Sequence, residues 1–344
     1  MEFSTSPYLL KDVSVQRVML KVLLALLPGI AAYVFFFGPA VLVQIAIASA
    51  TALVAEALML KVRGRPIGLF LADLSAVVTA WLIALTFPAI APWWLTVVGT
   101  LFAIVIAKQL YGGLGQNPFN PAMIAFAVCI VSFPALMSQW PGPDVDFGTQ
   151  LQAIFGLTPR LDALTSATPL DALKTGLKLG GEGNHIASIA GVMAAHGHTY
   201  GLIAGHGWEW VALGYLLGGL WLVQQKVITW HIPGAYLAAL AVLAGALWAW
   251  QPGAYASPLF HLFAGGAMLG AFFIATDPVS GATTPKGKLI FAAGAGLLTY
   301  LIRVFGGYPD GVAFAVLLMN ICVPLIDMYT QPPVFGEKTK EKEA

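Results

Sequence analysis

Long apolar runs dominate the sequence and leave few folds open to it. Of its residues, 58% are hydrophobic and only 10% are charged, whereas a soluble domain carries about 25% charged residues. A helix needs about 20 mainly apolar residues to cross a bilayer. Ten such runs are present, with approximate centres at Leu26, Ala48, Val78, Leu101, Cys129, Leu216, Ala241, Met268, Gly296 and Val316. The sequence therefore predicts an all-α polytopic membrane protein with ten transmembrane helices.

Charged residues predict the orientation and the divisions of the chain. The net charge is only +1, so we expect no nucleic-acid partner. Lys and Arg gather in alternate loops, which would all lie on one side if there are ten spans. Cytoplasmic loops carry the excess of Lys and Arg, so both termini are expected in the cytoplasm. The predicted divisions are a five-helix half (1–137), an outer loop (138–207), a second five-helix half (208–330) and a cytoplasmic tail (331–344).

The two halves of the sequence look related. Three matches follow one another at a nearly constant separation: residues 86–88 with 276–278, 111–113 with 305–307, and Cys129 with Cys322. Because each half has an odd number of spans, the second half would be inverted relative to the first. Inverted repeats place a functional site between the halves, lined by broken helices. The glycine pairs of the second match and the stretch Asn117–Pro121 are the expected breaks.

One stretch of the predicted outer loop carries a candidate attachment point for a cofactor. Residues Asp162 to Thr168 fit the pattern Asp-x-x-Ser/Thr-x-Ala-Thr/Ser, whose last hydroxyl can carry a flavin nucleotide through a phosphodiester. Thr168 is the candidate, and Asp162, Thr165 and Ser166 complete its motif. The alternative is an ordinary helix start, with Thr165 or Thr168 as the N-cap before Pro169.

A second stretch fits the same pattern, so the pattern alone does not decide the site. Residues Asp277 to Thr283 match it with the core Ser-Gly-Ala-Thr. On the charge count this stretch lies inside, whereas Thr168 lies outside. A polar turn at the inner surface is the interpretation we favour for Ser280 to Thr283.

The chain resembles the D-subunit family of Rnf electron-transport complexes and is similar to the B-subunit family of sodium-translocating NADH:quinone oxidoreductases. The resemblance spans nearly the whole chain. It rests on Ser6-Pro7, on Lys108 to Gly113, on Asn117 to Ala122, on Thr165 to Leu170, on Ala275 to Ser280 and on Phe305 to Gly311.

This resemblance implies a function, cofactors and partners. It implies a flavoprotein subunit of a six-subunit complex in the bacterial inner membrane, which couples electron transfer on the ferredoxin and NAD side to Na⁺ or H⁺ translocation. It implies covalent FMN, a possible second, non-covalent flavin (riboflavin), and partners that include the outer FMN-carrying G subunit and the membrane A and E subunits. The transferase that attaches such a flavin works on the outer side, which favours Thr168 over Thr283. The chain would carry electrons without catalysis by its side chains.

Ionisable residues inside predicted spans are candidates for function. Glu56, Asp73 and Asp327 all fall toward inner ends, where we expect them to reach water. Asp73 and Asp327 are the better candidates for a cation path, and interfacial anchoring is the alternative. Three histidines of the outer loop, His196, His198 and His206, are not expected to bind a metal. A secondary transporter or channel built on an inverted repeat, without flavin, is the alternative function.

Overall fold

Helices make up most of the molecule, as the sequence predicts. The computed structural model describes residues 14–143, 145–157, 164–180, 188–195 and 199–332. Within these ranges the only strands are β1 (Trp140–Pro141) and β2 (Thr165–Ser166), which pair antiparallel with Trp140 opposite Ser166. The all-α class is therefore confirmed.

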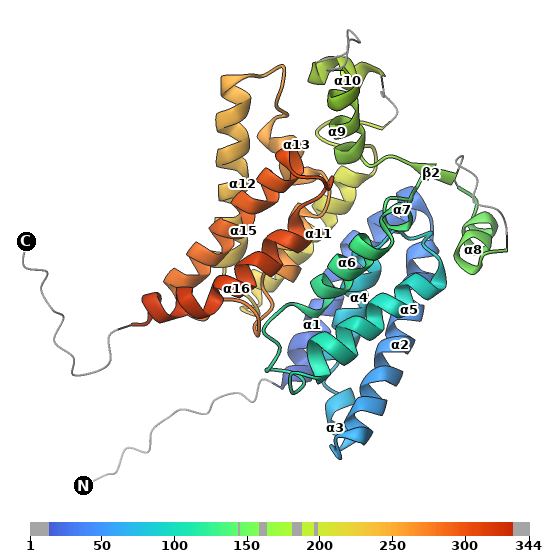
Figure 1. The fold of residues 1–344 in the computed structure, drawn as a ribbon, viewed down its shortest axis with the longest axis vertical. Coiled ribbons are helices and arrows are strands. Elements are labelled where there is room, and N and C mark those ends of the chain that lie inside the picture. The colour runs from blue at the N-terminus through green and yellow to red at the C-terminus, as the bar shows by residue number, and fades with distance from the viewer. Residues whose placement is uncertain (1–13, 144, 158–163, 181–187, 196–198, 333–344) are drawn as a thin grey trace, which may run out of the picture.

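The helices form two groups that follow each other along the chain (Figure 1). The first group comprises α1 (Val15–Phe37), α2 (Ala40–Val62), α3 (Ile67–Leu71), α4 (Ser75–Thr86), α5 (Trp93–Leu101) with its π-helical continuation η1 (Phe102–Gln109), α6 (Pro121–Ser132) and α7 (Pro134–Met137). The second group comprises α11 (Trp208–Gln224), α12 (His231–Trp250), α13 (Pro258–Phe263), α14 (Ala267–Leu269), η3 (Gly270–Ile274), α15 (Pro285–Phe305) and α16 (Val312–Thr330). Between them lie α8 (Phe147–Phe155), α9 (Pro169–Gly180) and α10 (Ile189–Ala195).

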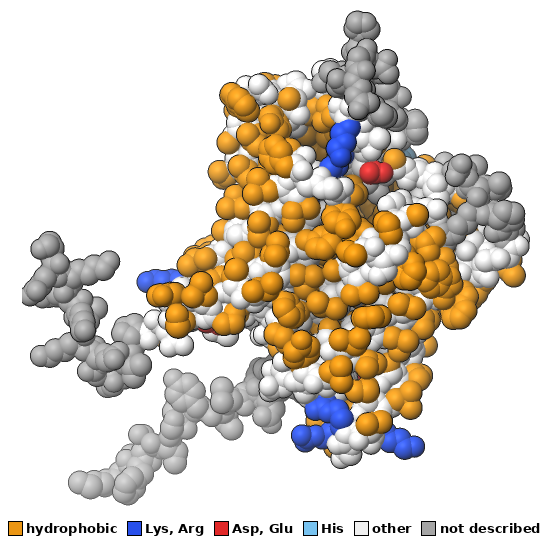
Figure 2. All heavy atoms as spheres, in the orientation of Figure 1, with side chains coloured by type: hydrophobic (Ala, Val, Ile, Leu, Met, Phe, Trp, Pro, Cys, Tyr) orange, Lys and Arg blue, Asp and Glu red, His pale blue; other side chains and the backbone are white. Residues whose placement is uncertain are grey.

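Five helices in the described ranges are long and apolar enough to cross a membrane: α1, α2, α12, α15 and α16. Each of the ten predicted centres lies in a helical segment, but several of these segments, such as α4 and α6, are shorter than a full span. Figure 2 shows hydrophobic side chains over the sides of the bundle. The chain is thus a multi-pass membrane protein, and the count of ten spans stays a prediction.

Local signals in the sequence account for several helix boundaries. Ser14 accepts a hydrogen bond from Arg17 N at the start of α1. Asn120 Oδ1 accepts from two backbone N–H groups at the start of α6, where Pro121 occupies the first position, which is favourable because that position needs no N–H donor. Residues 117–120 thus lie between η1 and α6, and a break inside a membrane span stays a prediction. Gly112 and Gly113 have φ of 123° and 94°, a backbone region that glycine enters at little cost.

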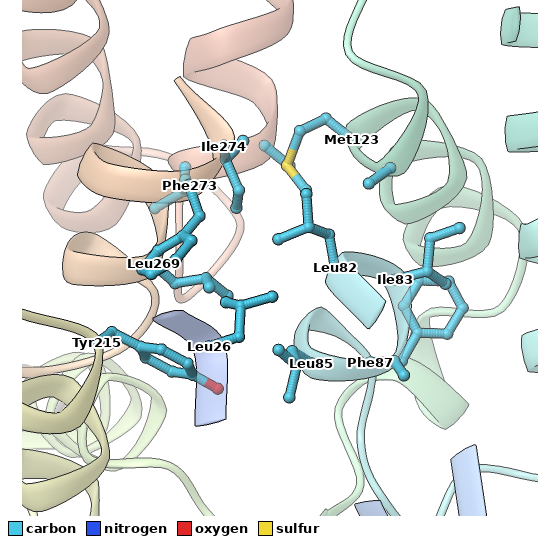
Figure 3. Close-up of a cluster of buried hydrophobic side chains, with 14 of the residues drawn as sticks. Leu26, Leu82, Ile83, Leu85, Phe87, Met123, Tyr215, Leu269, Phe273 and Ile274 are labelled. Carbon is cyan, nitrogen blue, oxygen red and sulfur yellow. The ribbon is translucent and has the colours of Figure 1, made fainter. Parts of the chain in front are cut away.

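Two contacts join the groups. Helix α1 packs along α11, and α6 packs against α16. Where α1 and α11 cross, a Cβ on Gly214 would lie 2.7 Å from the Gly29 backbone, so the two main chains touch almost directly. The side chains between the groups form one apolar core, to which both contribute (Figure 3).

The described part of the predicted outer loop, residues 138–207, packs against one end of this bundle. An amphipathic stretch of this segment forms α9, which packs with α10. Leu170 and Leu173 of α9 share a small apolar cluster with Val192 of α10 and Phe260 of α13. Because α9 is held in this way, the residues just before it have a defined position relative to the bundle.

Candidate functional site

Thr168 lies between β2 and α9, at the end of the bundle. Its Oγ1 accepts a hydrogen bond of 3.3 Å from Asp171 N, and its carbonyl accepts one of 2.8 Å from Ala172 N. Thr168 is thus the N-cap of α9, as the alternative interpretation of the motif predicted. Capping uses a lone pair of the hydroxyl oxygen, whereas a phosphodiester replaces its hydrogen. The two roles are therefore compatible at one residue.

The other motif residues have different surroundings. Ser166 pairs with Trp140 and Thr165 with Pro141 across the two short strands, and both are half-buried. This pairing fixes the backbone that leads into Thr168. Asp162 lies outside the described residues.

A cavity of about 130 Å³ opens beside Thr168, between the two groups of helices. Its lining is mainly apolar and includes aromatic side chains from several elements, among them Tyr33 of α1, Trp140 of β1 and Trp208 of α11. The ring of Trp208 lies 5.7 Å from that of Tyr33 and 5.4 Å from that of Trp140, both edge to face. The sequence alone does not assign these aromatic residues to one site, because they converge only through packing. We call this space the outer cavity, after the predicted outer loop to which Thr168 belongs.

Two carboxylates, Asp171 and Asp310, line the outer cavity. Asp310 Oδ1 forms an ion pair of 3.0 Å with Arg303 Nε. Arg303 is buried, and its guanidinium also donates to the carbonyls of His261 and Ala264. Burial raises the pKa of Asp171, and the nearby Lys174 offsets part of this shift. One wall of the cavity thus carries a fixed charge pair and a carboxyl group that resists ionisation.

A second cavity, of about 160 Å³, lies toward the other ends of the same helices. Helix α4 illustrates the arrangement, since Leu85 lines the outer cavity and Ser75 lines this one. Its lining contains polar groups from both halves of the chain: Ser75, Thr79, Lys108, Asn117, Asn120, Thr276 and Asp277. We call it the inner cavity. Leu26, Leu82 and Phe273 lie in the apolar core drawn in Figure 3.

A buried ion pair adjoins the inner cavity. Lys108 Nζ lies 2.7 Å from Glu56 Oε1, and each side chain is only 2% exposed. Lys108 also donates to Ser75 Oγ, and Gln109 Nε2 donates to Glu56 Oε1. The expectation that Glu56 reaches water at an inner end is therefore wrong. The packing of α2 against the π-helical η1 covers both charges.

The two candidates for a cation path belong to different hydrogen-bond networks. Asp73 Oδ1 accepts from the backbone and hydroxyl of Ser75, which is also the partner of Lys108. Asp327 accepts from the backbone N–H and the hydroxyl of Thr283. Both carboxylates are half-buried. Their role in ion movement stays a prediction.

The second match to the flavin pattern has a different environment from the first. Thr283 Oγ1 donates a hydrogen bond of 2.9 Å to Asp327 Oδ2. Earlier in the same stretch, Ser280 Oγ donates to Asp277 Oδ2 at 2.6 Å. This polar turn matches the interpretation favoured from the sequence. A phosphate on Thr283 would face the carboxylate of Asp327, which like-charge repulsion disfavours.

Neither metal ligands nor a cysteine cluster emerges in the described part of the chain. No group of three or more His, Cys, Asp or Glu side chains is placed to hold a metal ion there. Cys129 is buried and Cys322 is exposed, and both are free thiols. His196 and His198 lie outside the described residues, and the His206 ring faces Phe36.

Comparison with known proteins gives a consistent result over nearly the whole chain. The model of the NQR2, RnfD, RnfE family matches residues 2–336. A protein of Yersinia pseudotuberculosis serotype O:1b (strain IP 31758), named as the D subunit of an ion-translocating oxidoreductase complex, is 49% identical over 359 residues, which cover 99% of this chain and 100% of that protein. A protein of Escherichia coli (strain SE11) with the same name is 50% identical over 352 residues, covering 97% of this chain and 98% of its own.

Proposed function

Since this chain belongs to the NQR2, RnfD, RnfE family, we propose that it is a flavin-carrying membrane subunit of an Rnf-type ion-translocating oxidoreductase complex. The complex would couple electron transfer on the ferredoxin and NAD side to the translocation of Na⁺ or H⁺. The contribution of this chain is to hold FMN on Thr168 and to position it for electron transfer. The observation that carries the proposal is the place of Thr168, at a helix N-terminus and on the wall of a cavity lined by aromatic side chains.

The start of α9 suits a phosphate. The N-terminus of a helix carries a partial positive charge and unpaired backbone N–H groups, which together favour an anion. Pro169 has no N–H, so Leu170 and Asp171 supply the first donors of this helix. A phosphodiester on Thr168 Oγ1 would stand directly beside these groups. Thr283 also lies beside a helix N-terminus, since it precedes Thr284, the N-cap of α15. Its hydroxyl, however, donates to the Asp327 carboxylate, which would face a phosphate there.

The outer cavity suits a planar aromatic ring. Tyr33, Trp140 and Trp208 offer apolar and aromatic surface, while the carboxyl of Asp171 and the Arg303–Asp310 pair supply polar groups at one side. Bound FMN would supply the redox chemistry, and the protein sets its position and electrostatic environment. The aromatic side chains exclude water from the cavity wall, and Arg303 holds Asp310 in place.

The inner cavity is where we propose that a second, non-covalent flavin binds. It is lined by amide, hydroxyl and charged groups that can pair with the polar edge of riboflavin, including Asn117, Asn120 and Lys108. Two flavins at opposite ends of the same helices would let electrons cross the protein through its apolar core. The outer FMN-carrying G subunit and the membrane A and E subunits are the proposed partners.

The contacts between the halves support an inverted repeat of ten spans as part of this proposal. If spans one to five correspond to spans six to ten, α1 corresponds to α11 and α6 to α16. These are the pairs that join the two groups. A two-fold relation brings equivalent elements together at its axis, so this pattern is what a repeat predicts. The two cavities then lie between the repeats, and Asp73 and Asp327 remain the proposed residues of a cation path.

The experiment uses two matched variants of the full chain, expressed with the flavin transferase. Thr168→Val should abolish the ultraviolet fluorescence of the denatured gel band, and Thr283→Val should leave it unchanged. Both substitutions remove one hydroxyl and keep the side-chain volume similar. A fluorescent Thr168→Val band would refute the assignment. A wild-type band without fluorescence would favour the transporter alternative instead.

A further inference from the structure

A third cavity, of about 220 Å³, lies on the side of α9; Thr168 does not line it, but Leu170 lines both this cavity and the outer cavity. Its walls come from α9, α10, α13 and the loop before it, and the last turn of α15. We call it the basic pocket. Three of the described residues that line it carry basic side chains, namely Lys174, Lys178 and Arg303, and no acidic residue is among the described lining. Figure 2 shows Lys or Arg side chains on the surface at the level of α9.

The three basic side chains of the pocket differ in their exposure and in how many hydrogen bonds they already make. Arg303 is buried, and its guanidinium is bound to Asp310 and to two carbonyls. Lys174 Nζ donates to the carbonyls of Ile302 and Tyr308, which uses two of its three N–H groups. Lys178 is exposed. Burial lowers the pKa of Lys174 and the nearby Lys178 ammonium lowers it further, while the Asp171 carboxylate offsets part of the shift. An anion between the two lysines would relieve their repulsion.

One buried polar atom in the basic pocket has no partner. His261 is only 3% exposed, and within the described ranges its Nδ1 finds no hydrogen-bond partner. A buried polar group without a partner is unfavourable by about 1–3 kcal/mol. The imidazole lines the same cavity as the two lysines, so a ligand that enters the pocket can satisfy it.

The rest of the lining is apolar and lies at the level of a membrane interface. Leu173, Leu177 and Val304 supply aliphatic surface. Trp250, at the end of α12, is 67% exposed and stacks on Tyr255, which lines the pocket. Exposed Trp and Tyr at helix ends mark the headgroup level of a bilayer. A ligand here must therefore combine an anionic group with an apolar part.

We propose that the basic pocket binds the phosphate group of an anionic phospholipid, whose acyl chains lie against the aliphatic side chains of α9 and α15. Lys174 and Lys178 contact the phosphate, and His261 Nδ1 completes its hydrogen bonds. The bound lipid fastens α9 to α15. The position of the segment that bears Thr168 then depends on the lipid around the complex.

The test uses the purified complex that contains the full chain, in neutral detergent, with short-chain phosphatidylglycerol as the probe. Bound lipid is counted by native mass spectrometry during a titration. A basic residue near a membrane surface contributes about 1 kcal/mol to the binding of anionic lipid. Lys178→Gln should therefore weaken binding about fivefold, and Lys178→Glu should weaken it further. Lys178→Arg should retain it.

Controls separate this site from general charge effects. Lys286→Glu changes an exposed lysine at the opposite end of α15 and should leave binding unchanged. Equal binding of phosphatidylglycerol to wild type and to Lys178→Glu would overturn the proposal. It would also fail if the wild type bound zwitterionic phosphatidylcholine as tightly as phosphatidylglycerol. Inorganic phosphate is the competitor: if it displaces the lipid at a similar concentration, the pocket is a site for free phosphate and the lipid proposal fails. In-gel flavin fluorescence of Lys178→Gln reports separately on Thr168.

Discussion

The crossing of α1 and α11 offers a sharp test of how the two halves are joined. Gly218 of α11 faces the backbone of α1. A Cβ at this position would overlap the Ala25 carbonyl oxygen and would lie 2.8 Å from its carbonyl carbon. Backbone atoms inside a helix cannot rotate away as the end of a side chain can. Gly218→Ala must therefore push the two helices apart.

The expected magnitude combines two opposing terms. Alanine in place of glycine inside a helix favours the folded state by about 1 kcal/mol. The overlap requires the helices to separate, and overpacking of a well-packed core costs about 1–3 kcal/mol, sometimes more. We expect the upper end of that range, because the contact is with backbone and because separation also loosens neighbouring contacts. The net prediction is a destabilisation of about 2 kcal/mol or more.

The matched control is Gly245→Ala, inside α12. Its Cβ would meet only Pro258 Cγ, at 3.4 Å, which is an ordinary contact. This variant has the helix-propensity gain without the overlap, so it should be neutral or slightly stabilised. Each variant is heated in detergent to a series of temperatures, and size-exclusion chromatography then measures the folded protein that remains. The loss of folded protein with temperature gives the apparent Tm. A Gly218→Ala protein that melts at or above the wild-type Tm would refute direct backbone contact between α1 and α11.

Three further predictions concern charges and orientation. Glu56→Ala should lower the free energy of unfolding by about 3–5 kcal/mol, because it leaves the buried Lys108 charge without its partner; a double variant that also replaces Lys108 by Met should recover part of the loss, and additive losses would contradict the coupling. Arg303→Met leaves the Asp310 carboxylate without its partner and should destabilise the chain by about 3 kcal/mol or more, measured as the apparent Tm. An unchanged Tm would show that the Arg303 charge is hydrated. A Cys at Ser166 should react with a membrane-impermeant thiol reagent in intact cells. A Cys at Thr283, which is exposed, should react only after permeabilisation, and the reverse pattern would overturn the orientation.

Much of the fold follows from local features of the sequence. Apolar runs predict where helices form, since a helix must bury its apolar side chains or expose them to lipid. The start of α6 follows from Asn120 and Pro121, which cap a helix through their own chemistry. The Arg303–Asp310 pair is also within reach of sequence reasoning, because seven residues separate its members across one turn between helices.

Long-range contacts explain what sequence reasoning missed. Glu56 and Lys108 are 52 residues apart, and each alone resembles a charge that ends a span near water. They meet only because η1 packs against α2, and the π-helical turn of η1 sets which side chains face that helix. The convergence of Tyr33, Trp140 and Trp208 has the same origin. No spacing in the sequence predicts either the buried ion pair or the aromatic cluster.

The choice between the two flavin-like motifs shows where structure adds to sequence. Both stretches present an Asp, a hydroxyl residue and a final Thr at the same spacing, so the pattern cannot separate them. Their neighbours can: Thr283 donates its hydroxyl hydrogen to a carboxylate, while Thr168 accepts at a helix N-terminus and borders the outer cavity. A phosphate adds negative charge, which a carboxylate repels and a helix N-terminus stabilises. The carboxylate bonded to Thr283 Oγ1 therefore disfavours a phosphate there, independently of which side of the membrane the residue faces.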